Sequence, residues 1–212
     1  IACALCWALL SMNMGISGFT IQSEHIVALF ALAGIYFLIK YFDKKSYFLI
    51  ARSGLFFSFA FGVKQTSFFL GLFAGILLVG KQFFEKERDF KRIILSVLIF
   101  SAAVIIPVAL DLFIVWKRGG WEDFNYYFFD IRKQYTSFIT FEQGIEYLKM
   151  SLPSMYNNYK FICILSAIGS LTIFLTSVKW WVKLAVLGFF VFGFLTVMPG
   201  NHYYGHYFLQ WV

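Results

Sequence analysis

The sequence predicts an all-α protein: a polytopic transmembrane helix bundle of about seven spans with one amphipathic loop region outside the membrane. Hydrophobic residues make up 60% of the 212 residues and charged residues only 14%, whereas about a quarter of the residues in a soluble domain are charged. The 29 Phe, 12 Tyr and 6 Trp suit lipid-facing helices and aromatic belts at membrane interfaces. No linker-like stretch divides the chain, so we expect a single transmembrane domain over residues 1–212.

Apolar runs give the expected order of the spans. They fall at about 1–19, 25–42, 47–63, 66–80, 93–115, 159–178 and 184–199, with another opening near 207. The stretch from 47 to 80 is too long for one span, and Lys64 and Gln65 interrupt it, so we expect two short helices that meet there. A helix over 47–63 reaches roughly 26 Å, just enough for the hydrocarbon core. Because both ends of the chain resemble the interior of a bundle, we expect an interior fragment of a longer protein.

Basic residues gather in alternate connections, which predicts the orientation of the chain. The connections around 40–52, 81–92 and 179–183 hold the whole net charge of +7, because the remaining basic and acidic residues balance. Cytoplasmic connections of membrane proteins carry such an excess of Lys and Arg. We therefore expect these connections to be cytoplasmic. The net positive charge is then explained by the orientation of the chain in the membrane, and we expect no nucleic-acid partner.

The long connection at about 117–158 has the pattern of helices that lie along a membrane surface. Its apolar residues recur at helical spacing between charged ones, as in "GIEYLKMSL". Alternation of sides places this loop, Glu24, the break at Lys64 and the segment "NHYYGHY" on the extracytoplasmic side. The groups capable of chemistry are therefore expected to converge on that side.

Glu24 and Lys64 each allow two interpretations. Glu24 directly precedes an apolar run, where a carboxylate either caps a helix or belongs to a polar site that opens outward. Lys64 follows Gly54, Ser58 and Gly62, whose four-residue spacing lets helices approach closely. A lysine at membrane depth indicates a functional site, unless its ammonium extends to the interface. We predict that Lys64 pairs with Glu24, because a nearby carboxylate would keep a partly buried lysine charged.

His202 and His206 lie four residues apart, just after Pro199-Gly200. This spacing suits a metal ion, but no Cys, Asp or Glu lies nearby and Gly205 weakens the helix that would align the two rings, so we expect no metal site. Two interpretations remain: anchoring at the membrane interface, and contact with a phosphate or sugar, for which His and Tyr supply hydrogen-bond donors.

Three stretches together resemble the C-type (GT-C) glycosyltransferases, in particular the dolichyl-phosphate-mannose protein mannosyltransferases and the bacterial aminoarabinose lipid A transferases. "IQSEHIVALFALAGIYFLIKYF" resembles the family segment in which an acidic residue opens a helix that ends in basic residues. "SGLFFSFAFGVKQTSFFLGLFAGILL" resembles its small-residue helix, helix break and following helix. "PGNHYYGHYFLQWV" resembles its segment before a late helix.

The resemblance implies an integral membrane enzyme of the bacterial inner or plasma membrane. It would move a sugar from a polyprenyl-phosphate-linked donor to a lipid, glycan or protein acceptor on the extracytoplasmic face. Glu24 matches the family's second carboxylate and would be catalytic, while Lys64, His202, His206 and Tyr207 would bind the donor. The family's main catalytic carboxylate lies N-terminal to residue 1. No cofactor is implied beyond the donor, the need for a divalent metal stays open, and the bilayer, donor and acceptor are the partners.

Two other classes of membrane protein stay open. A polysaccharide polymerase or ligase also has many helices and one large outer loop with essential arginines, and Arg132 fits that pattern. A transporter requires polar residues near the midplane of several helices. Because the charged residues here lie mostly at the ends of the predicted helices, transport is the weaker alternative.

Overall fold

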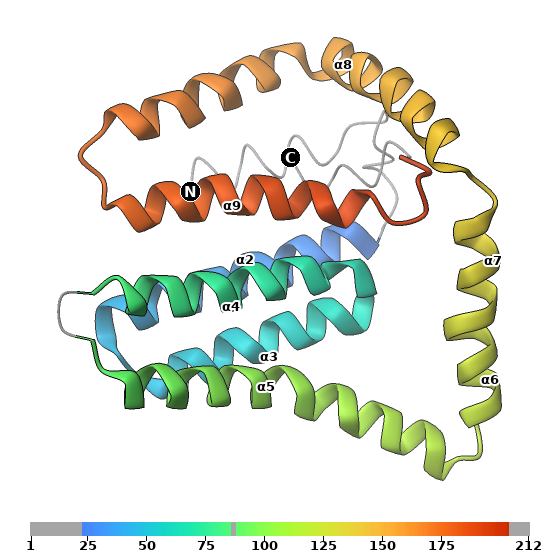
Figure 1. Ribbon diagram of the computed structural model, residues 1–212, viewed down its shortest axis with the longest axis horizontal. Helices are drawn as coiled ribbons and strands as arrows, with labels where there is room; N and C mark the ends of the chain where they lie inside the picture. Colours follow the sequence, from blue (N-terminus) through green and yellow to red (C-terminus); the bar gives the residue numbers. More distant parts are fainter. Residues whose placement is uncertain (1–22, 86–87, 204–212) are drawn as a thin grey trace.

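The computed structural model describes residues 23–85 and 88–203, and this part of the chain is helical, without a strand (Figure 1). The all-α prediction is confirmed for these residues. The helices are α2 (Ser23–Lys44), α3 (Tyr47–Val63), the short 3₁₀ helix η2 (Gln65–Ser67), α4 (Phe68–Phe83), α5 (Phe90–Lys117), α6 (Trp121–Asn125), the π-helical turn η3 (Tyr126–Asp130), α7 (Ile131–Ser137), α8 (Phe141–Leu175) and α9 (Trp180–Val197).

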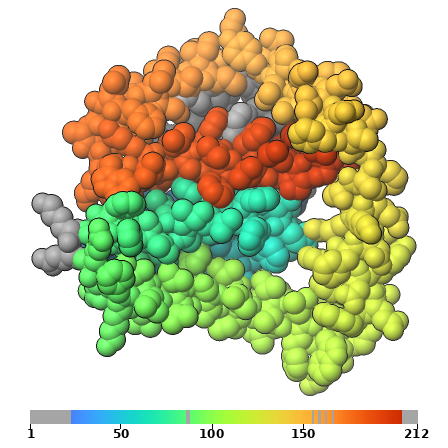
Figure 2. Space-filling model, viewed as in Figure 1, coloured from blue at the N-terminus to red at the C-terminus, as the bar shows by residue number. Residues whose placement is uncertain are grey.

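The helices α2 to α5 form a bundle in which successive helices run in opposite directions (Figure 1). α3 packs against both α2 and α5, and α9 packs against α4. The interior is apolar and holds large side chains such as Leu38, Ile50, Phe57 and Leu78. In the space-filling view α9 lies along α4, while α6 and α7 stand apart from the bundle at the edge of the molecule (Figure 2).

Small residues allow the close packing of α3 against its two neighbours. A Cβ atom added to Gly54 would lie 2.6 Å from the carbonyl oxygen of Phe100 in α5, so no larger residue fits there without a shift of the backbone. The Ser58 hydroxyl donates a hydrogen bond to the Val104 carbonyl at 2.9 Å. On the α2 side, a Cβ atom on Gly34 would lie 2.7 Å from the ring of Phe57. The predicted role of Gly54 and Ser58 in close helix packing is therefore confirmed.

Four of the described helical segments are long and apolar enough to cross a membrane. They are Ser23–Lys44, Gln65–Phe83, Phe90–Lys117 and Trp180–Val197. Tyr47–Val63 is apolar as well but shorter. The coarse prediction of a membrane-type helix bundle is thus supported, and the number of about seven spans is not confirmed.

The predicted spans differ from the structure mainly at α8. The span predicted at 159–178 is not a separate helix, because α8 runs without interruption from the predicted loop into that apolar run. Pro153 inside α8 lacks the N–H that would bond to the preceding turn, which accounts for the bend of this helix in Figure 1 without ending it. The predicted span at 1–19 and the one opening near 207 lie outside the described residues.

Candidate functional site

The helix break predicted at Lys64 is confirmed. Lys64 has extended backbone angles, φ −151° and ψ 119°, between α3 and η2. Its N–H donates to the Ala60 carbonyl at 3.0 Å and closes α3, and its own carbonyl accepts from the Ser67 N–H at 3.0 Å and opens the next turn. The chain therefore turns back sharply at Lys64, which lies at the junction of two helices.

Glu24 meets Lys64 at this junction, as predicted. Glu24 lies in the first turn of α2 and is almost fully buried. Its Oε1 accepts a hydrogen bond from the Lys64 ammonium, and its Oε2 accepts one from the Ser23 hydroxyl at 3.1 Å. Helix capping alone does not account for Glu24, because the carboxylate is engaged by a cation from another helix. A buried charge of this kind requires such a partner.

A second cation reaches the same junction from the loop region. The Arg132 guanidinium in α7 donates a hydrogen bond to the side-chain carbonyl of Gln65, the residue after Lys64. It also lies over the ring of Phe128, 4.9 Å from the ring centroid. From the sequence, Arg132 was noted only because it fits a polysaccharide polymerase or ligase. Nothing in the sequence indicated that Arg132 contacts the helix break at Lys64.

The segment after α9 packs against α7 and α8. The rings of Tyr135 and His202 have centroids 4.1 Å apart, and His202 and Tyr203 are both buried. The Ser151 hydroxyl donates to the Tyr203 carbonyl at 3.0 Å. Burial raises the pKa of the Tyr203 hydroxyl above its ordinary value, so this group is protonated at neutral pH.

This segment also holds an unusual backbone. Gly200, Asn201 and Tyr203 have φ angles of +86°, +57° and +45°. Non-glycine residues rarely adopt such angles, and they persist where surrounding contacts enforce them. One such contact is tight, because a Cβ atom on Gly144 in α8 would lie 2.6 Å from the Cβ of Asn201.

One face of α7 connects the helix break at Lys64 with the segment after α9. Arg132 and Tyr135 lie one helical turn apart; the first contacts Gln65 and the second contacts His202. The structure thus brings Glu24 and Lys64 into direct contact and relates His202 to them through α7. His206 and Tyr207, the other two predicted binding residues, lie outside the described residues. Tyr135 was missed by the sequence analysis, since an aromatic residue on a surface helix carries no signal of its partner.

The opposite end of the bundle carries a different charge cluster. The Glu85 carboxylate accepts hydrogen bonds from the ammonium groups of Lys45 at 2.6 Å and Lys81 at 2.5 Å. Burial disfavours the ionised carboxyl, yet the hydrogen bonds from the two lysines prevail and hold the pKa of Glu85 below its ordinary value. We call the two ends of the bundle the Lys64 end and the Glu85 end. The groups predicted on opposite sides of a membrane lie at opposite ends of the bundle; that these ends face opposite sides of a membrane stays a prediction.

The Lys64 end has the chemistry of an anion site. An ammonium and a guanidinium are the strongest hydrogen-bond donors that a protein offers to phosphate, and both are held near one helix break.

Over residues 23–85 and 88–203, no group of three or more His, Cys, Asp or Glu side chains is placed to hold a metal ion. No protein-family model, curated protein or solved structure matches the chain significantly. The residues of the site therefore carry the functional argument.

Proposed function

We propose that this chain is part of a membrane glycosyltransferase that moves a sugar from a polyprenyl-phosphate-linked donor to a lipid, glycan or protein acceptor. The buried Glu24–Lys64 pair at a helix break is the observation that supports this most strongly. A buried ion pair is a weak source of stability. Its position beside Arg132, at the end of an apolar bundle, suits recognition of a lipid-linked phosphate.

The reaction assigns a role to each of these groups. The acceptor hydroxyl attacks the anomeric carbon of the sugar, the bond from that carbon to the phosphate oxygen breaks, and the polyprenyl phosphate leaves with the bonding electrons. Lys64 and Arg132 stabilise the growing negative charge on the phosphate. The acceptor proton passes to a carboxylate base.

Glu24 acts through Lys64 in this mechanism. Both of its oxygens are already engaged, one by the Lys64 ammonium and the other by the Ser23 hydroxyl. It is therefore better suited to hold Lys64 charged and in position than to accept a proton from the acceptor. Glu24 is thus a positioning residue here rather than the general base.

The topology belongs to the same proposal. About seven spans cross the membrane, the Lys64 end is extracytoplasmic and the Glu85 end is cytoplasmic. The helices α6 and α7 and the first part of α8 then lie on the extracytoplasmic side, where Arg132 of α7 reaches the helix break. The ring of His202 packs at a tilt against the ring of Tyr135 in α7, on the same side.

Sugar transfer by single variants of the full-length protein tests this function. In membranes supplied with polyprenyl-phosphate sugar, Lys64→Ala and Glu24→Ala should each lower the rate of transfer by about 100-fold or more, the effect of removing one charge-stabilising donor. The matched control is Lys45→Ala, which removes a lysine from the ion cluster at the Glu85 end. Transfer near the wild-type rate by Lys64→Ala, with normal membrane insertion, would contradict the assignment.

A polysaccharide polymerase or ligase is the second candidate, and the position of Arg132 in the loop region, where such an enzyme would place its essential arginines, favours it. Such an enzyme would use the arginine to bind a long glycan on the outer face. The products separate the two candidates: a transferase adds a single sugar to its acceptor, whereas a polymerase yields a ladder of chain lengths. Arg132→Lys would shorten that ladder in a polymerase.

A further inference from the structure

Two basic side chains on the outer face of the α2–α3 hairpin lie over aromatic rings. The guanidinium carbon of Arg52 is 4.1 Å from the ring centroid of Phe48 and 5.5 Å from that of Phe37. The Lys40 ammonium is 4.5 Å from the ring centroid of Tyr36. The rings of Tyr36 and Phe37 are in edge contact, with centroids 5.4 Å apart. The two cations and three rings therefore form one continuous row across α2 and α3, which we call the Arg52 row.

The cations of the Arg52 row have no carboxylate partner within the part of the chain that the structure describes. None of the ion pairs within 4.0 Å among these residues includes Lys40 or Arg52. Lys45 and Lys81, at the same end of the bundle, instead share the Glu85 carboxylate. An aromatic ring holds a guanidinium in place but offers its N–H groups no oxygen acceptor. The donors of Arg52 are therefore free to bind an anion such as phosphate.

The Arg52 row lies inside the two helices and not at their tips. Lys40 is four residues before the end of α2 at Lys44, and Arg52 is five residues after the start of α3 at Tyr47. At 1.5 Å per residue these positions are about 6 Å and about 7.5 Å from the helix ends. The Lys40 ammonium lies over Tyr36, one turn further from the end of α2, whereas basic side chains at a membrane interface commonly extend toward water. The cations therefore adjoin the apolar surface of the hairpin.

That apolar surface continues from the Arg52 row along both helices. Leu32 and Leu29 on α2 are 49% and 61% exposed, and Leu55 and Phe59 on α3 are exposed as well. They follow the row at intervals of three or four residues, so they share its face of each helix. We call these four residues the apolar strip. An apolar strip that ends in two cations is complementary to a phospholipid, which joins acyl chains to an anionic phosphate.

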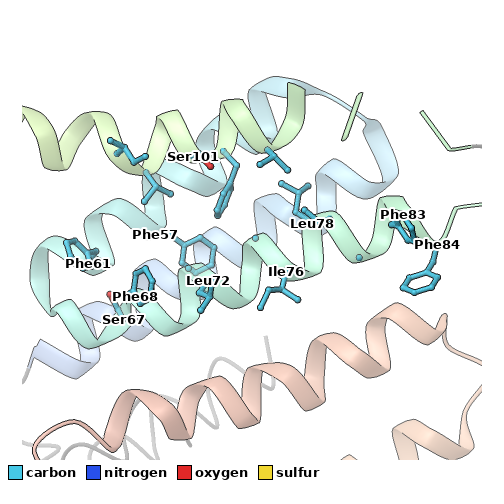
Figure 3. A pocket seen from close by; sticks show the side chains of 18 residues that line it. Phe57, Phe61, Ser67, Phe68, Leu72, Ile76, Leu78, Phe83, Phe84 and Ser101 are labelled. Atoms are coloured by element: carbon cyan, nitrogen blue, oxygen red, sulfur yellow. The ribbon is translucent and has the colours of Figure 1, made fainter. Parts of the chain in front are cut away.

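The groove between α4 and α5 provides a contrast (Figure 3). It has a volume of about 750 Å³, and the described residues that line it, such as Phe68, Leu72 and Ile76, include no charged side chain. An apolar lining attracts acyl chains whatever the charge of their head group. Of these two surfaces, only the α2–α3 face carries groups that can select a lipid by charge.

We propose that the outer face of the α2–α3 hairpin binds an anionic phospholipid of the bilayer, with its phosphate at Arg52 and Lys40 and its acyl chains along the apolar strip. Charge decides the class of lipid. Two cations without a carboxylate attract a head group of net negative charge more strongly than a zwitterionic one, whose own cation they repel. This inference is independent of the proposed function, since the face lies toward the Glu85 end and away from Lys64.

Native mass spectrometry of the purified full-length protein tests the inference. The probes are phosphatidylglycerol and phosphatidylcholine with the same acyl chains. We expect phosphatidylglycerol to bind at least about tenfold more tightly, because each basic residue near an anionic lipid contributes about a factor of five. The double variant Lys40→Gln/Arg52→Gln should bind the two lipids equally.

A matched control removes the same charge elsewhere at the same end of the bundle. Lys91→Gln/Lys179→Gln replaces two exposed lysines, one in α5 and one directly before α9. The preference for phosphatidylglycerol should persist in this protein. Loss of the preference to the same degree as in Lys40→Gln/Arg52→Gln would show diffuse attraction only and would overturn the inference.

Phe48→Leu distinguishes a held guanidinium from general attraction. It leaves the charge of the protein unchanged and removes the nearest ring beside Arg52, so it should weaken the binding of phosphatidylglycerol several-fold. Phe48 is 62% exposed, so its replacement disturbs little packing and decides the matter if the double variant fails to fold. Phe90→Leu, at the similarly exposed start of α5, is the matched control and should change nothing.

Glycerol phosphate distinguishes a bound lipid from a free anion, because it carries the phosphate without acyl chains. We expect it not to displace phosphatidylglycerol at equal concentration, since it cannot cover the apolar strip. Displacement would show a site for a free anion and would overturn the inference. Equal affinity of the wild-type protein for the two lipids, or an unchanged preference in both Lys40→Gln/Arg52→Gln and Phe48→Leu, would overturn it as well.

Discussion

The two ends of the bundle each join lysine to a carboxylate, but they bury the charges to different degrees. At the Lys64 end the side chains of Lys64 and Glu24 are 19% and 2% exposed, and one acid meets one base. At the Glu85 end the side chains of Lys45 and Glu85 are both 28% exposed, and Lys81, 15% exposed, adds a second base, so the two ends differ in the burial of the carboxylate. Solvated pairs contribute little to stability, and an excess of lysine at one end of a helix bundle is typical of the cytoplasmic side of membrane proteins.

The buried pair needs another explanation. Replacing a buried ion pair with apolar residues of similar volume is often neutral or stabilising, so folding alone does not require Glu24 and Lys64. The polar groups that are most deeply buried at the Glu85 end are neutral. The Tyr41 hydroxyl donates to the Gln82 side chain at 3.0 Å, and the Gln82 amide donates to the Ser96 hydroxyl at 2.8 Å. Under the proposed function, the buried charges of this bundle serve the donor site, whereas the buried neutral polar groups hold helices together.

The largest stability effect is expected from breaking the buried pair. Lys64→Met leaves the Glu24 carboxylate buried without its cation and should lower the free energy of unfolding by about 3 kcal/mol. The double variant Glu24→Leu/Lys64→Met removes both charges and should recover most of that loss. Reversible unfolding by steric trapping in bicelles measures both. If the double variant is less stable than Lys64→Met, the pair is structural and the comparison between the ends fails.

A smaller effect is expected from the neutral network at the Glu85 end. Gln82→Leu deprives the buried Tyr41 hydroxyl of its acceptor, which should cost about 2 kcal/mol of unfolding free energy. Gln134→Leu on the exposed α7 is the matched control and should change little. The same unfolding assay applies, and sugar transfer per folded molecule should stay normal in Gln82→Leu. Loss of transfer in a folded Gln82→Leu protein would mean that function is not confined to the Lys64 end.

The smallest effect is expected from the partly exposed Glu85 cluster and depends on pH. The pKa of Glu85 is lowered in the folded protein, so its contribution to stability is present above its unfolded value, near 4.5, and is lost as the pH falls through the lower folded value. The contribution should not exceed about 1 kcal/mol. Glu85→Gln should therefore match the wild-type stability in strong acid and fall slightly below it at neutral pH. An opposite pH dependence would show that the lysines do not stabilise the carboxylate.

Local features of this structure were predictable from the sequence because each has a short-range physical signal. Lys64 and Gln65 interrupt an apolar run that is too long for one span, and the structure breaks the helix there. The pairing of Glu24 with Lys64 followed from counting sides of the membrane, since consecutive spans bring the start of one helix to the end of the next. The small residues Gly54 and Ser58 indicated close packing in the same way.

Features that depend on the path of the chain were not predictable. The apolar run at 159–178 looked like a separate span, but Pro153 bends α8 without ending it, and the helix continues from the loop. The contact between Arg132 and Gln65 joins residues 67 positions apart and depends on where α7 lies. Gly62 shares the four-residue spacing of Gly54 and Ser58, and yet a Cβ atom there would meet nothing within 4 Å, because periodicity does not reveal what lies opposite a glycine.

The central claim is that the Glu24–Lys64 pair serves the donor site and not the fold. Sugar transfer by the double variant Glu24→Leu/Lys64→Met tests it most directly, because that protein should be close to wild type in stability. Its counterpart is Lys45→Met/Glu85→Leu, which removes an ion pair at the other end. We expect the first protein to fold and insert normally and to lose transfer by about 100-fold or more, while the second retains it. Wild-type transfer by the first protein would contradict the account.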